Sequence, residues 1–346
     1  MSEAAAVTAA VFARTDLGRT REHNEDAFLV ADLTNGKSSL HSAPASCPVG
    51  PRGLLFLVAD GMGGAAAGEL ASAMAADLIF GHLVGTWTRE NPEDIHVERF
   101  TLRLREAVEL ANLQIHTYAR EHPEVRGMGT TATVAGVFGD QLYLAQVGDS
   151  RAYLLRFDKI VQLTKDQSLT QRLVDAGELT EEEAEASARR NIILQALGPD
   201  PRIRVDLTWH QLRRGDLLVL CSDGLSGLVK RDEIGRMARE QADLERLGAE
   251  LIDLANSRGG PDNITVVLAR FDGPGLSEPD GASNPAYQVY AAEDEEVDED
   301  EAPSAPLPAD PPPAPTLRRT GNPLGLALLL AGALLVVFAA ILAFTG

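Results

Sequence analysis

Four aspartates in this sequence stand at the ends of apolar runs, close to glycines. Asp60 closes the run in "LLFLVADGMGG", Asp149 follows the run in "YLAQVGDSRAYLL", and Asp223 closes the run in "GDLLVLCSDGLSG". Asp262, in "GGPDNITVVL", precedes such a run instead. Glycine carries no side chain, so another backbone or an ion can come close to each carboxylate. A single aspartate beside a glycine would indicate only a turn, but four aspartates placed in this way suggest a shared ligand.

A second group of charged residues precedes an apolar run near the N-terminus. Within "TDLGRTREHNEDAF" it comprises Arg21, Glu25 and Asp26. Taken alone, such residues are common in turns, helix caps and exposed surface. Together with the four aspartates, they predict an acidic nest for two or three divalent cations, Mg²⁺ or Mn²⁺, which prefer carboxylate, carbonyl and water ligands. Without cations, the carboxylates would repel one another and some would stay protonated.

The composition narrows the classes of partner and of metal site. The chain has 346 residues, 31 Lys and Arg against 51 Asp and Glu, and a formal net charge of -20. Nucleic-acid binding needs a surplus of Lys and Arg, so no nucleic-acid partner is expected. Two cysteines, Cys47 and Cys221, are too few for a disulfide framework or a thiolate metal site, which suits a reducing compartment. The seven histidines include no pair at ligand spacing, so a metal is expected on oxygen ligands.

Strand and helix patterns alternate over the first 271 residues. Apolar and β-branched runs predict strands at 7–16, 27–32, 53–59, 130–138, 141–147, 151–157, 203–209, 216–221 and 263–271. Helical periodicity predicts helices at 68–84, 97–121, 168–190 and 231–258. Residues 35–53 are expected to form a long surface loop, and Gly139-Asp140 a hairpin turn. Consecutive hairpins with helices in blocks predict antiparallel sheets covered by helices.

The composition changes after residue 271. Residues 272–323 are rich in Pro, Ala and acid and include "EDEEVDEDE", so we expect a disordered linker. Residues 324–344 are 21 uncharged, almost wholly apolar residues. As a helix at about 1.5 Å per residue they would span about 31 Å, enough to cross a bilayer. Arg318 and Arg319 precede them, so we expect a tail anchor in the cell membrane with the domain at 1–271 in the cytoplasm.

Seven blocks of the sequence follow one another in a recognisable order. They are "RTREHNED", "LVADGMGG", "GMGTTATV", "LAQVGDSRAYLL", "LTKDQSL", "LLVLCSDGLSG" and "GGPDNITVV". In order and spacing they resemble the metal-dependent serine/threonine protein phosphatases of the PP2C (PPM) family, in their bacterial form. The resemblance covers about residues 7–271. It implies an α+β fold, a four-layer α/β/β/α sandwich of two mostly antiparallel sheets flanked by helices.

The resemblance implies a role for the aspartates that follow or precede the apolar runs. Asp60 would bridge two metal ions, and the Gly61 carbonyl would bind one of them. Asp223 and Asp262 would complete the ligands of the pair. The cofactor implied is Mn²⁺ or Mg²⁺, with two core ions and a weaker third.

The remaining candidate residues would act around this pair of ions. Glu25 and Asp26 would act through metal-bound waters, and Asp149 would help to hold the third ion. Arg21 would bind the substrate phosphate, which suits a planar and permanently charged guanidinium. Gly227 replaces an acid that many members carry, which would weaken the third metal. Residues 168–202 resemble the mobile flap and helical region of the family, and an ordinary amphipathic helix is the alternative interpretation of this stretch.

The implied reaction is the hydrolysis of phosphoserine and phosphothreonine in proteins. A water bridging two metal ions would lose a proton and attack phosphorus directly, while the ions and Arg21 neutralise charge on the phosphate. No covalent phosphoenzyme is needed. Met62 stands where animal-type members carry a histidine after Asp-Gly, so a metal-bound water is the candidate acid for the leaving group.

Two other interpretations stay open. "GDSR" resembles the Gly-Asp-Ser of some esterases, which would need Ser150 as nucleophile and a late Asp-x-x-His that the C-terminal half lacks. The other is a membrane-tethered pseudophosphatase that binds phosphoproteins without turnover. Loss of a core metal acid would favour it, but Asp60, Asp223 and Asp262 are all present. The expected partners are phosphoprotein substrates, including a membrane Ser/Thr kinase and its targets.

Overall fold

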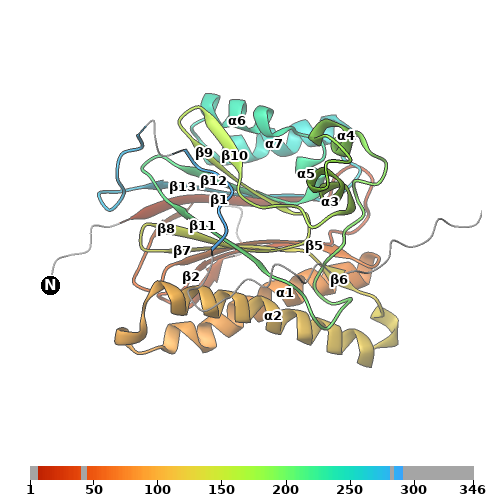
Figure 1. The fold of residues 1–346 in the computed structure, drawn as a ribbon, viewed down its shortest axis with the longest axis horizontal. Coiled ribbons are helices and arrows are strands. Elements are labelled where there is room, and N and C mark those ends of the chain that lie inside the picture. The colour runs from red at the N-terminus through yellow and green to blue at the C-terminus, as the bar shows by residue number, and fades with distance from the viewer. Residues whose placement is uncertain (1–6, 40–44, 281–283, 291–346) are drawn as a thin grey trace, which may run out of the picture. The chain divides into compact units, whose positions relative to one another are not determined.

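The computed structural model of the protein describes residues 7–39, 45–280 and 284–290. Two antiparallel sheets pack face to face, and helices cover their outer faces (Figure 1). The predicted α+β sandwich of two antiparallel sheets flanked by helices is confirmed. The predicted transmembrane helix at 324–344 and most of the predicted linker lie outside the described residues.

The first sheet has six strands and carries the first and last long strands of the domain. Its order is β10 (Lys159–Gln162), β9 (Arg151–Arg156), β12 (Leu217–Cys221), β13 (Ile264–Asp272), β1 (Thr8–Asp16) and β4 (Ala45–Pro48). All neighbouring pairs are antiparallel. The two strands farthest apart in sequence, β1 and β13, therefore lie side by side at its centre.

The second sheet has seven strands. Its order is β11 (Asp206–Gln211), β8 (Gln141–Val147), β7 (Ala132–Phe138), β5 (Leu54–Met62), β2 (Asp26–Asp32) and β3 (Lys37–Ser39), and β6 (Gly129–Thr130) pairs with the end of β5. The hairpin expected at Gly139-Asp140 joins β7 to β8. β11 stands at one edge of this sheet.

The central strands are apolar on both faces because both faces are covered. In β5, alternate residues Leu54, Phe56 and Val58 belong to the core between the two sheets. Leu55 and Leu57 belong to the core between this sheet and the helices. Each fully buried side chain of this kind contributes about 1.5–3 kcal/mol. A strand buried on both sides reads as a continuous apolar run, which is how these strands appear in the sequence.

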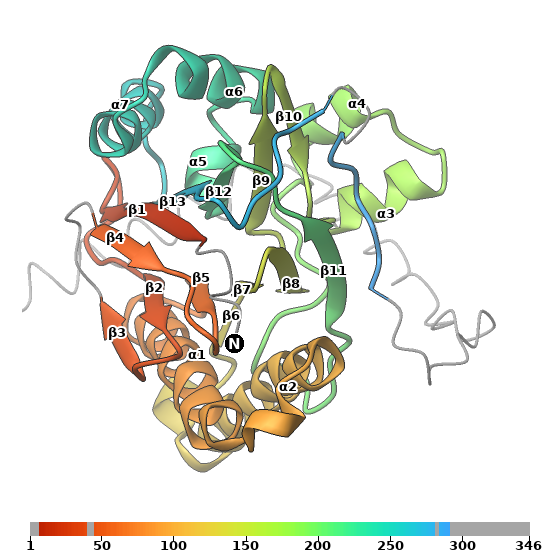
Figure 2. The same cartoon turned by 90° about the vertical axis from the view of Figure 1, so that its left-hand side faces the viewer.

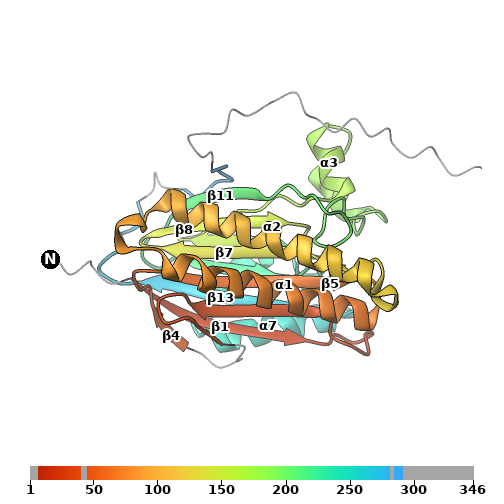
Figure 3. The same ribbon diagram turned by 90° about the horizontal axis from the view of Figure 1, so that it is seen from below.

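Helices cover both outer faces of the sandwich. The seven-stranded sheet is covered by α1 (Ala65–Gly85) and α2 (Val97–Glu121), as Figure 3 shows from below. The six-stranded sheet is covered by α5 (Asp223–Ser226), α6 (Arg231–Glu240) and α7 (Leu244–Ser257). Two short helices, α3 (Leu169–Asp175) and α4 (Glu181–Ala186), stand at the side of the sandwich (Figure 2). Short 3₁₀ turns lie at Trp87–Arg89, Pro92–Asp94 and Pro123–Val125.

Two predicted helices are wrong in extent because each is interrupted. The helix predicted at 168–190 is broken into α3 and α4 at Gly177, whose φ of 72° favours glycine. Thr180 then caps α4 through a capping box with Glu183. The helix predicted at 231–258 is broken into α6 and α7, where the Asp243 side chain accepts hydrogen bonds from the amides of Glu245 and Arg246.

Three further element predictions are corrected. The loop predicted at 35–53 contains the short edge strands β3 and β4. The strand predicted at 203–209 is β11, which begins at Asp206. The run that was expected to stop at Asp60 continues as β5 to Met62, because Gly61 pairs with Thr130 and Met62 with Gly129.

One helix within residues 7–39, 45–280 and 284–290 is long and apolar enough to span a membrane by length and composition. It covers 24 residues, Ala66–Arg89. The helical part of this segment, α1, packs on β5 and on α2, as a core helix does.

Parts of the predicted linker contact the folded layers. Leu276 is buried in the core between the sheets. The amide of Trp209 in β11 donates to the carbonyl of Gln288 at 3.1 Å, and the amide of Tyr290 donates to the carbonyl of Leu207 at 2.9 Å. The prediction of a disordered linker that begins at residue 272 is therefore wrong for these described residues. The predicted end of the linker at residue 323 stays a prediction.

Candidate active site

The core between the sheets changes from apolar to polar at one end. In β2 and β5, the residues that continue the inward-facing series are Asp26 and Asp60, which lie directly opposite each other in the register. Side chains of such a pair stand on the same face, typically about 4.5–5.5 Å apart at Cβ. The alternation that builds the apolar core therefore also brings two carboxylates together at its end.

The six-stranded sheet contributes hydroxyls and acids to the same end. The Oγ atoms of Ser222 and Thr265 donate to Oδ2 of Asp26 at 2.7 and 2.6 Å. Asp223 directly follows Ser222 and begins α5. Asp262 lies two residues before β13 begins, at the same end. The acids of the two sheets thus meet where the inter-sheet core ends.

The backbone of Asp60 is fixed by two threonines. The Oγ1 of Thr131 accepts a hydrogen bond from the Asp60 amide at 2.9 Å. The carbonyl of Asp60 accepts from Oγ1 of Thr130 at 3.0 Å and from the amide of Thr131 at 2.9 Å. These contacts fix the backbone of Asp60, and its side chain lies within hydrogen-bond reach of Asp223.

Asp149 and Ser150 lie at the turn between β8 and β9, which belong to different sheets. Asp149 is buried, and its Oδ1 has no hydrogen-bond partner among the described residues. Ser150 is fully buried, and its Oγ is 2.8 Å from Oγ1 of Thr131. A nucleophile must reach its substrate, so the esterase interpretation of Ser150 is wrong.

Arg21 lies on the loop between β1 and β2, above the acids. Its Nη2 donates to Oδ2 of Asp262 at 2.9 Å, and its Nη1 lies 3.7 Å from Oε1 of Glu25. Asn263 fixes this loop, because its Oδ1 accepts from the Glu25 amide and its Nδ2 donates to the carbonyls of Leu17 and His23. The carboxylates of Asp262 and Glu25 thus hold the Arg21 guanidinium beside the other acids of the site.

Burial and mutual repulsion raise the pKa of three of these carboxyls. Burial raises the pKa of Asp26 to about 7, although two hydroxyls donate to it. Burial, with the nearby charge of Asp223, raises the pKa of Asp149 to about 8. Burial and then the charges of Asp26 and Asp223 hold the pKa of Asp60 well above its usual range. Burial and repulsion disfavour the ionised form of these carboxyls, and bound cations would stabilise that form.

The donor set fits hard divalent cations. Buried carboxylates outnumber basic groups here, and the unpartnered Oδ1 of Asp149 is free to bind. Within the described ranges, no three acidic, histidine or cysteine side chains form a group that could hold a metal alone. An ion would therefore also take ligands from backbone carbonyls and water, as Mg²⁺ and Mn²⁺ commonly do.

Gly61 was expected to be a glycine so that its carbonyl could reach an ion. The structure gives a packing reason for it: a Cβ on Gly61 would lie 2.2 Å from the carbonyl oxygen of Gly68 and 2.5 Å from that of Glu25. A Cβ on Gly68 would lie 1.9 Å from Oε2 of Glu25. These two glycines let the start of α1 come close to the acids. The ligand role of the Gly61 carbonyl stays a prediction.

A groove of about 840 Å³ opens at this end of the sandwich. Arg21, Asp149, Asp223 and Asp262 line it, together with residues of the flap, which is defined here as residues 168–202. Asp60 and Asp26 are half-buried and are not among these lining residues, but the side chain of Asp60 lies within hydrogen-bond reach of Asp223, which is. The groove thus gives a substrate access to Arg21 and to three of the predicted acids.

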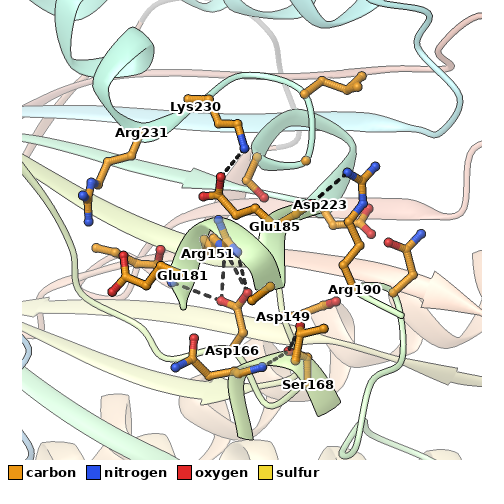
Figure 4. Close-up of a pocket in the computed structure, with 18 of the residues that line it drawn as sticks. Asp149, Arg151, Asp166, Ser168, Glu181, Glu185, Arg190, Asp223, Lys230 and Arg231 are labelled. Atoms are coloured by element: carbon orange, nitrogen blue, oxygen red, sulfur yellow. Dashed lines mark hydrogen bonds and ion pairs between the residues drawn. The ribbon is translucent and has the colours of Figure 1, made fainter. Parts of the chain in front are cut away.

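Charged pairs cross the groove and stabilise its walls (Figure 4). Glu185 in α4 pairs with Lys230, which precedes α6, and so ties the flap to the main body. Arg151 binds Asp166 through both carboxylate oxygens, at 3.0 and 2.7 Å. Arg151 also lowers the pKa of Asp149, against the larger effect of burial.

Sequence reasoning missed several residues that build the site. Ser222 and Thr265 were not singled out, although each continues the inward-facing series of its strand. The period of two along β12 and β13 was the signal that could have found them. Asn263 was quoted only as part of "GGPDNITVV", and Arg151 only as part of "LAQVGDSRAYLL". Their roles depend on contacts across the fold that no local pattern shows.

Comparison with known families and relatives agrees with this geometry. A family model described as protein phosphatase 2C matches residues 45–269. The serine/threonine phosphatase stp of Listeria monocytogenes is 37% identical over 259 residues, which is 75% of this chain and 94% of that protein.

Solved structures give the same result. The Mycobacterium tuberculosis serine/threonine phosphatase PstP/Ppp has a TM-score of 0.63 and 34% identity, covering 78% of this chain and 100% of that one. The catalytic domain of PstP, solved in complex with two manganese ions, has a TM-score of 0.61 and 34% identity, covering 77% and 99%. Sequence, fold and site geometry therefore indicate one group of proteins.

Proposed function

The chain belongs to the protein phosphatase 2C family, and we propose that it hydrolyses phosphoserine and phosphothreonine in proteins with Mn²⁺ or Mg²⁺ as cofactor. It is a bacterial-type protein-serine/threonine phosphatase, and its substrates are phosphoproteins. The observation that carries the chemistry is the meeting of Asp26 and Asp60 from one sheet with Asp223 and Asp262 from the other, beside an open groove that Asp223 and Asp262 line.

The acids at this end of the sandwich supply the ligands that the cofactor needs. Asp60, Asp223 and Asp262, with the Gly61 carbonyl, would hold the two core ions. When bound, these ions lower the pKa of a water molecule and neutralise charge on the phosphate. The structure of the PstP catalytic domain with two manganese ions supports a cofactor of two ions.

The remaining acids would act around the core. Glu25 and Asp26 would act through water, because Oδ2 of Asp26 already accepts from Ser222 and Thr265. Asp149 would hold a weaker third ion with its unpartnered Oδ1.

The reaction forms a bond from a water oxygen to phosphorus and breaks the bond from phosphorus to the serine or threonine oxygen. Arg21 is placed to bind the phosphate, since its side chain is 45% exposed and lines the groove. Asp262 and Glu25 orient that guanidinium. Met62 has no proton to give to the leaving oxygen, so the proton comes from water.

The experiment that tests the function is phosphate release from a phosphothreonine peptide by the full chain. We expect turnover with Mn²⁺ and a return to the background rate when EDTA is added, since the buried acids cannot act without cations. Restoring excess Mn²⁺ should restore the rate. Turnover that persists in EDTA would contradict the proposed chemistry.

The pseudophosphatase alternative is not favoured. A pseudoenzyme of this fold is expected to have lost a core acid, and Asp60, Asp223 and Asp262 are present at one end of the sandwich. The pseudophosphatase alternative would be supported if the chain bound a phosphopeptide but released no phosphate from it with either Mn²⁺ or Mg²⁺.

We also infer that residues 324–344 anchor the enzyme in the cell membrane, with the domain on the cytoplasmic side. The support is their uncharged, apolar composition and the arginines Arg318 and Arg319 before them. A tether confines the enzyme near membrane-bound targets, so a membrane Ser/Thr kinase and its substrates would be its partners.

Fractionation tests the anchor. We expect the full chain in the membrane fraction, extracted by detergent but not by high salt, because apolar insertion is not screened by ions. A variant without residues 324–344 should move to the soluble fraction. Recovery of both forms in the soluble fraction would contradict the proposal.

A further inference from the structure

A segment of the predicted linker adds to the edge of the seven-stranded sheet. We call residues 284–290 the strap. Thr208 of β11 lies opposite Val289 in an antiparallel bridge, flanked by the hydrogen bonds of Trp209 to Gln288 and of Tyr290 to Leu207. Figure 2 shows the strap in blue beside β11. It covers an edge that would otherwise expose unpaired backbone groups.

Side chains as well as backbone hold the strap in place. The ring of Tyr290 stacks edge-on against Tyr143 of β8, with centroids 5.6 Å apart. Tyr290 also packs on the core under α1 and α2, and Pro285 is buried. Tyr287 therefore lies between two anchored positions of one short segment.

Tyr287 lines the same groove as Arg21 and Asp223. Its side chain is 41% exposed. Burial, together with the charges of Asp206 and Asp175, raises the pKa of its hydroxyl, so the hydroxyl keeps its proton at neutral pH and can donate a hydrogen bond. The two acids have cationic partners, Arg204 for Asp206 and Lys165 for Asp175.

The groove is larger than one phosphorylated side chain requires. Its volume of about 840 Å³ lies near the top of the range of about 300–1,000 Å³ that accepts drug-sized ligands. Besides the acids it is lined by Gln162, Thr164 and Lys165, and Lys165 pairs with Asp175, whose charge acts on Tyr287. It therefore has room for substrate residues that flank the phosphorylated one.

We propose that Tyr287 is a specificity-determining residue that contacts the substrate chain beside the phosphorylated serine or threonine. The proposal rests on the proposed function. It adds that the groove recognises the substrate residues beside the phosphorylated one. Because the charges around Tyr287 are paired, its exposed ring offers an apolar contact with a polar tip. The favoured substrates carry an apolar residue next to the phosphorylated one.

The test compares two substrates of the full chain with Mn²⁺. One is a phosphothreonine peptide with apolar residues on both sides of the phosphothreonine, and the other is para-nitrophenyl phosphate, which has no flanking chain. For Tyr287→Ala we expect the ratio of the two kcat/KM values, peptide over aryl phosphate, to fall about fivefold, as loss of part of an aromatic contact predicts. The fall should come from a higher KM for the peptide.

Val289→Ala is the matched control. Val289 is 61% exposed on the same strap, so its truncation perturbs the strap without removing a groove-lining ring, and the ratio should stay as in the unsubstituted chain. An unchanged ratio for Tyr287→Ala would overturn the proposal, and so would an equal fall in both variants. Absence of Mn²⁺-dependent aryl phosphate turnover in the unsubstituted chain would instead contradict the proposed function.

Discussion

We expect the Asp223→Asn variant to release phosphate from a phosphothreonine peptide more than about a hundredfold more slowly than the unsubstituted chain, since loss of an outer-shell partner of a metal alone costs about 10–100-fold. Asp223 is placed as a ligand of the core ions, and an amide has no negative charge to hold them. The measurement is the initial rate across a Mn²⁺ titration. A variant that retains the parent rate at saturating Mn²⁺ would remove Asp223 from the metal site.

A stability measurement separates lost chemistry from lost folding. Burial and the neighbouring charge of Asp262 raise the pKa of Asp223, so removing its charge should not destabilise the metal-free domain. In EDTA we expect the variant to melt at or above the parent temperature. In Mn²⁺ the parent should gain about 2.7 kcal/mol at a hundredfold excess over Kd, and the variant should not. The control is Asp253→Asn, the same change at an exposed site on α7.

Arg21→Ala in the same assay should behave differently. Arg21 is assigned to the phosphate and not to the ions, so the Mn²⁺ dependence should be kept while KM for the peptide rises. The neighbouring Arg19→Ala, at an exposed position, should leave both unchanged. Loss of the Mn²⁺ response in Arg21→Ala would contradict its assignment.

The second large effect is expected on stability. Arg156 and Asp216 form a buried ion pair between β9 and the start of β12, with side chains 5% and 0% exposed. Arg156 donates to both oxygens of Asp216, at 2.8 and 2.7 Å, and the Arg213 amide donates to Oδ2 at 2.8 Å. Asp216→Asn removes the carboxylate charge from this buried pair, and breaking a buried pair by removing one partner's charge costs about 3–5 kcal/mol.

Thermal and denaturant unfolding in EDTA check this expectation. For a domain of this size, each kcal/mol shifts Tm by about 2–4 °C, so a fall of about 6–20 °C is expected. The matched control is Asp175→Asn, whose partner Lys165 is 43% exposed; a surface pair of this kind contributes about 0–1 kcal/mol. Equal losses in the two variants would show that burial of the first pair is not what matters.

The sequence predicted those elements whose limits are set locally. The limits of α2 and β8 agree with the predicted 97–121 and 141–147, because each has a complete amphipathic or apolar pattern and clear turn residues beyond it. The breaks at Gly177 and Asp243 were missed because helical periodicity continues across them. The short edge strands β3, β4 and β10 have too few residues to show a period, and they form only because a partner strand is already there.

The acids of the site could be predicted because glycines and the ends of apolar runs mark them. What could not be predicted is which oxygens remain free. Asp26 and Asp60 cannot be told apart in the sequence, yet Oδ2 of Asp26 already accepts hydrogen bonds from Ser222 and Thr265 of the opposite sheet. Likewise, the strap was expected to be free because its composition is that of a linker, while its contacts depend on the exposed edge of β11.

The arrangement of the acids across the two sheets has a consequence for local motion. Asp26 and Asp60 belong to one sheet, and Asp223 and Asp262 adjoin strands of the other. Cations held among them would cross-link the two halves of the sandwich at the end where the apolar core stops. Separation of the sheets from that end would then require release of the cations first. Amide hydrogen exchange should therefore slow as Mn²⁺ is added at those ends of β5 and β12 that lie beside Asp60 and Asp223. Exchange at the opposite ends of the same two strands should stay the same.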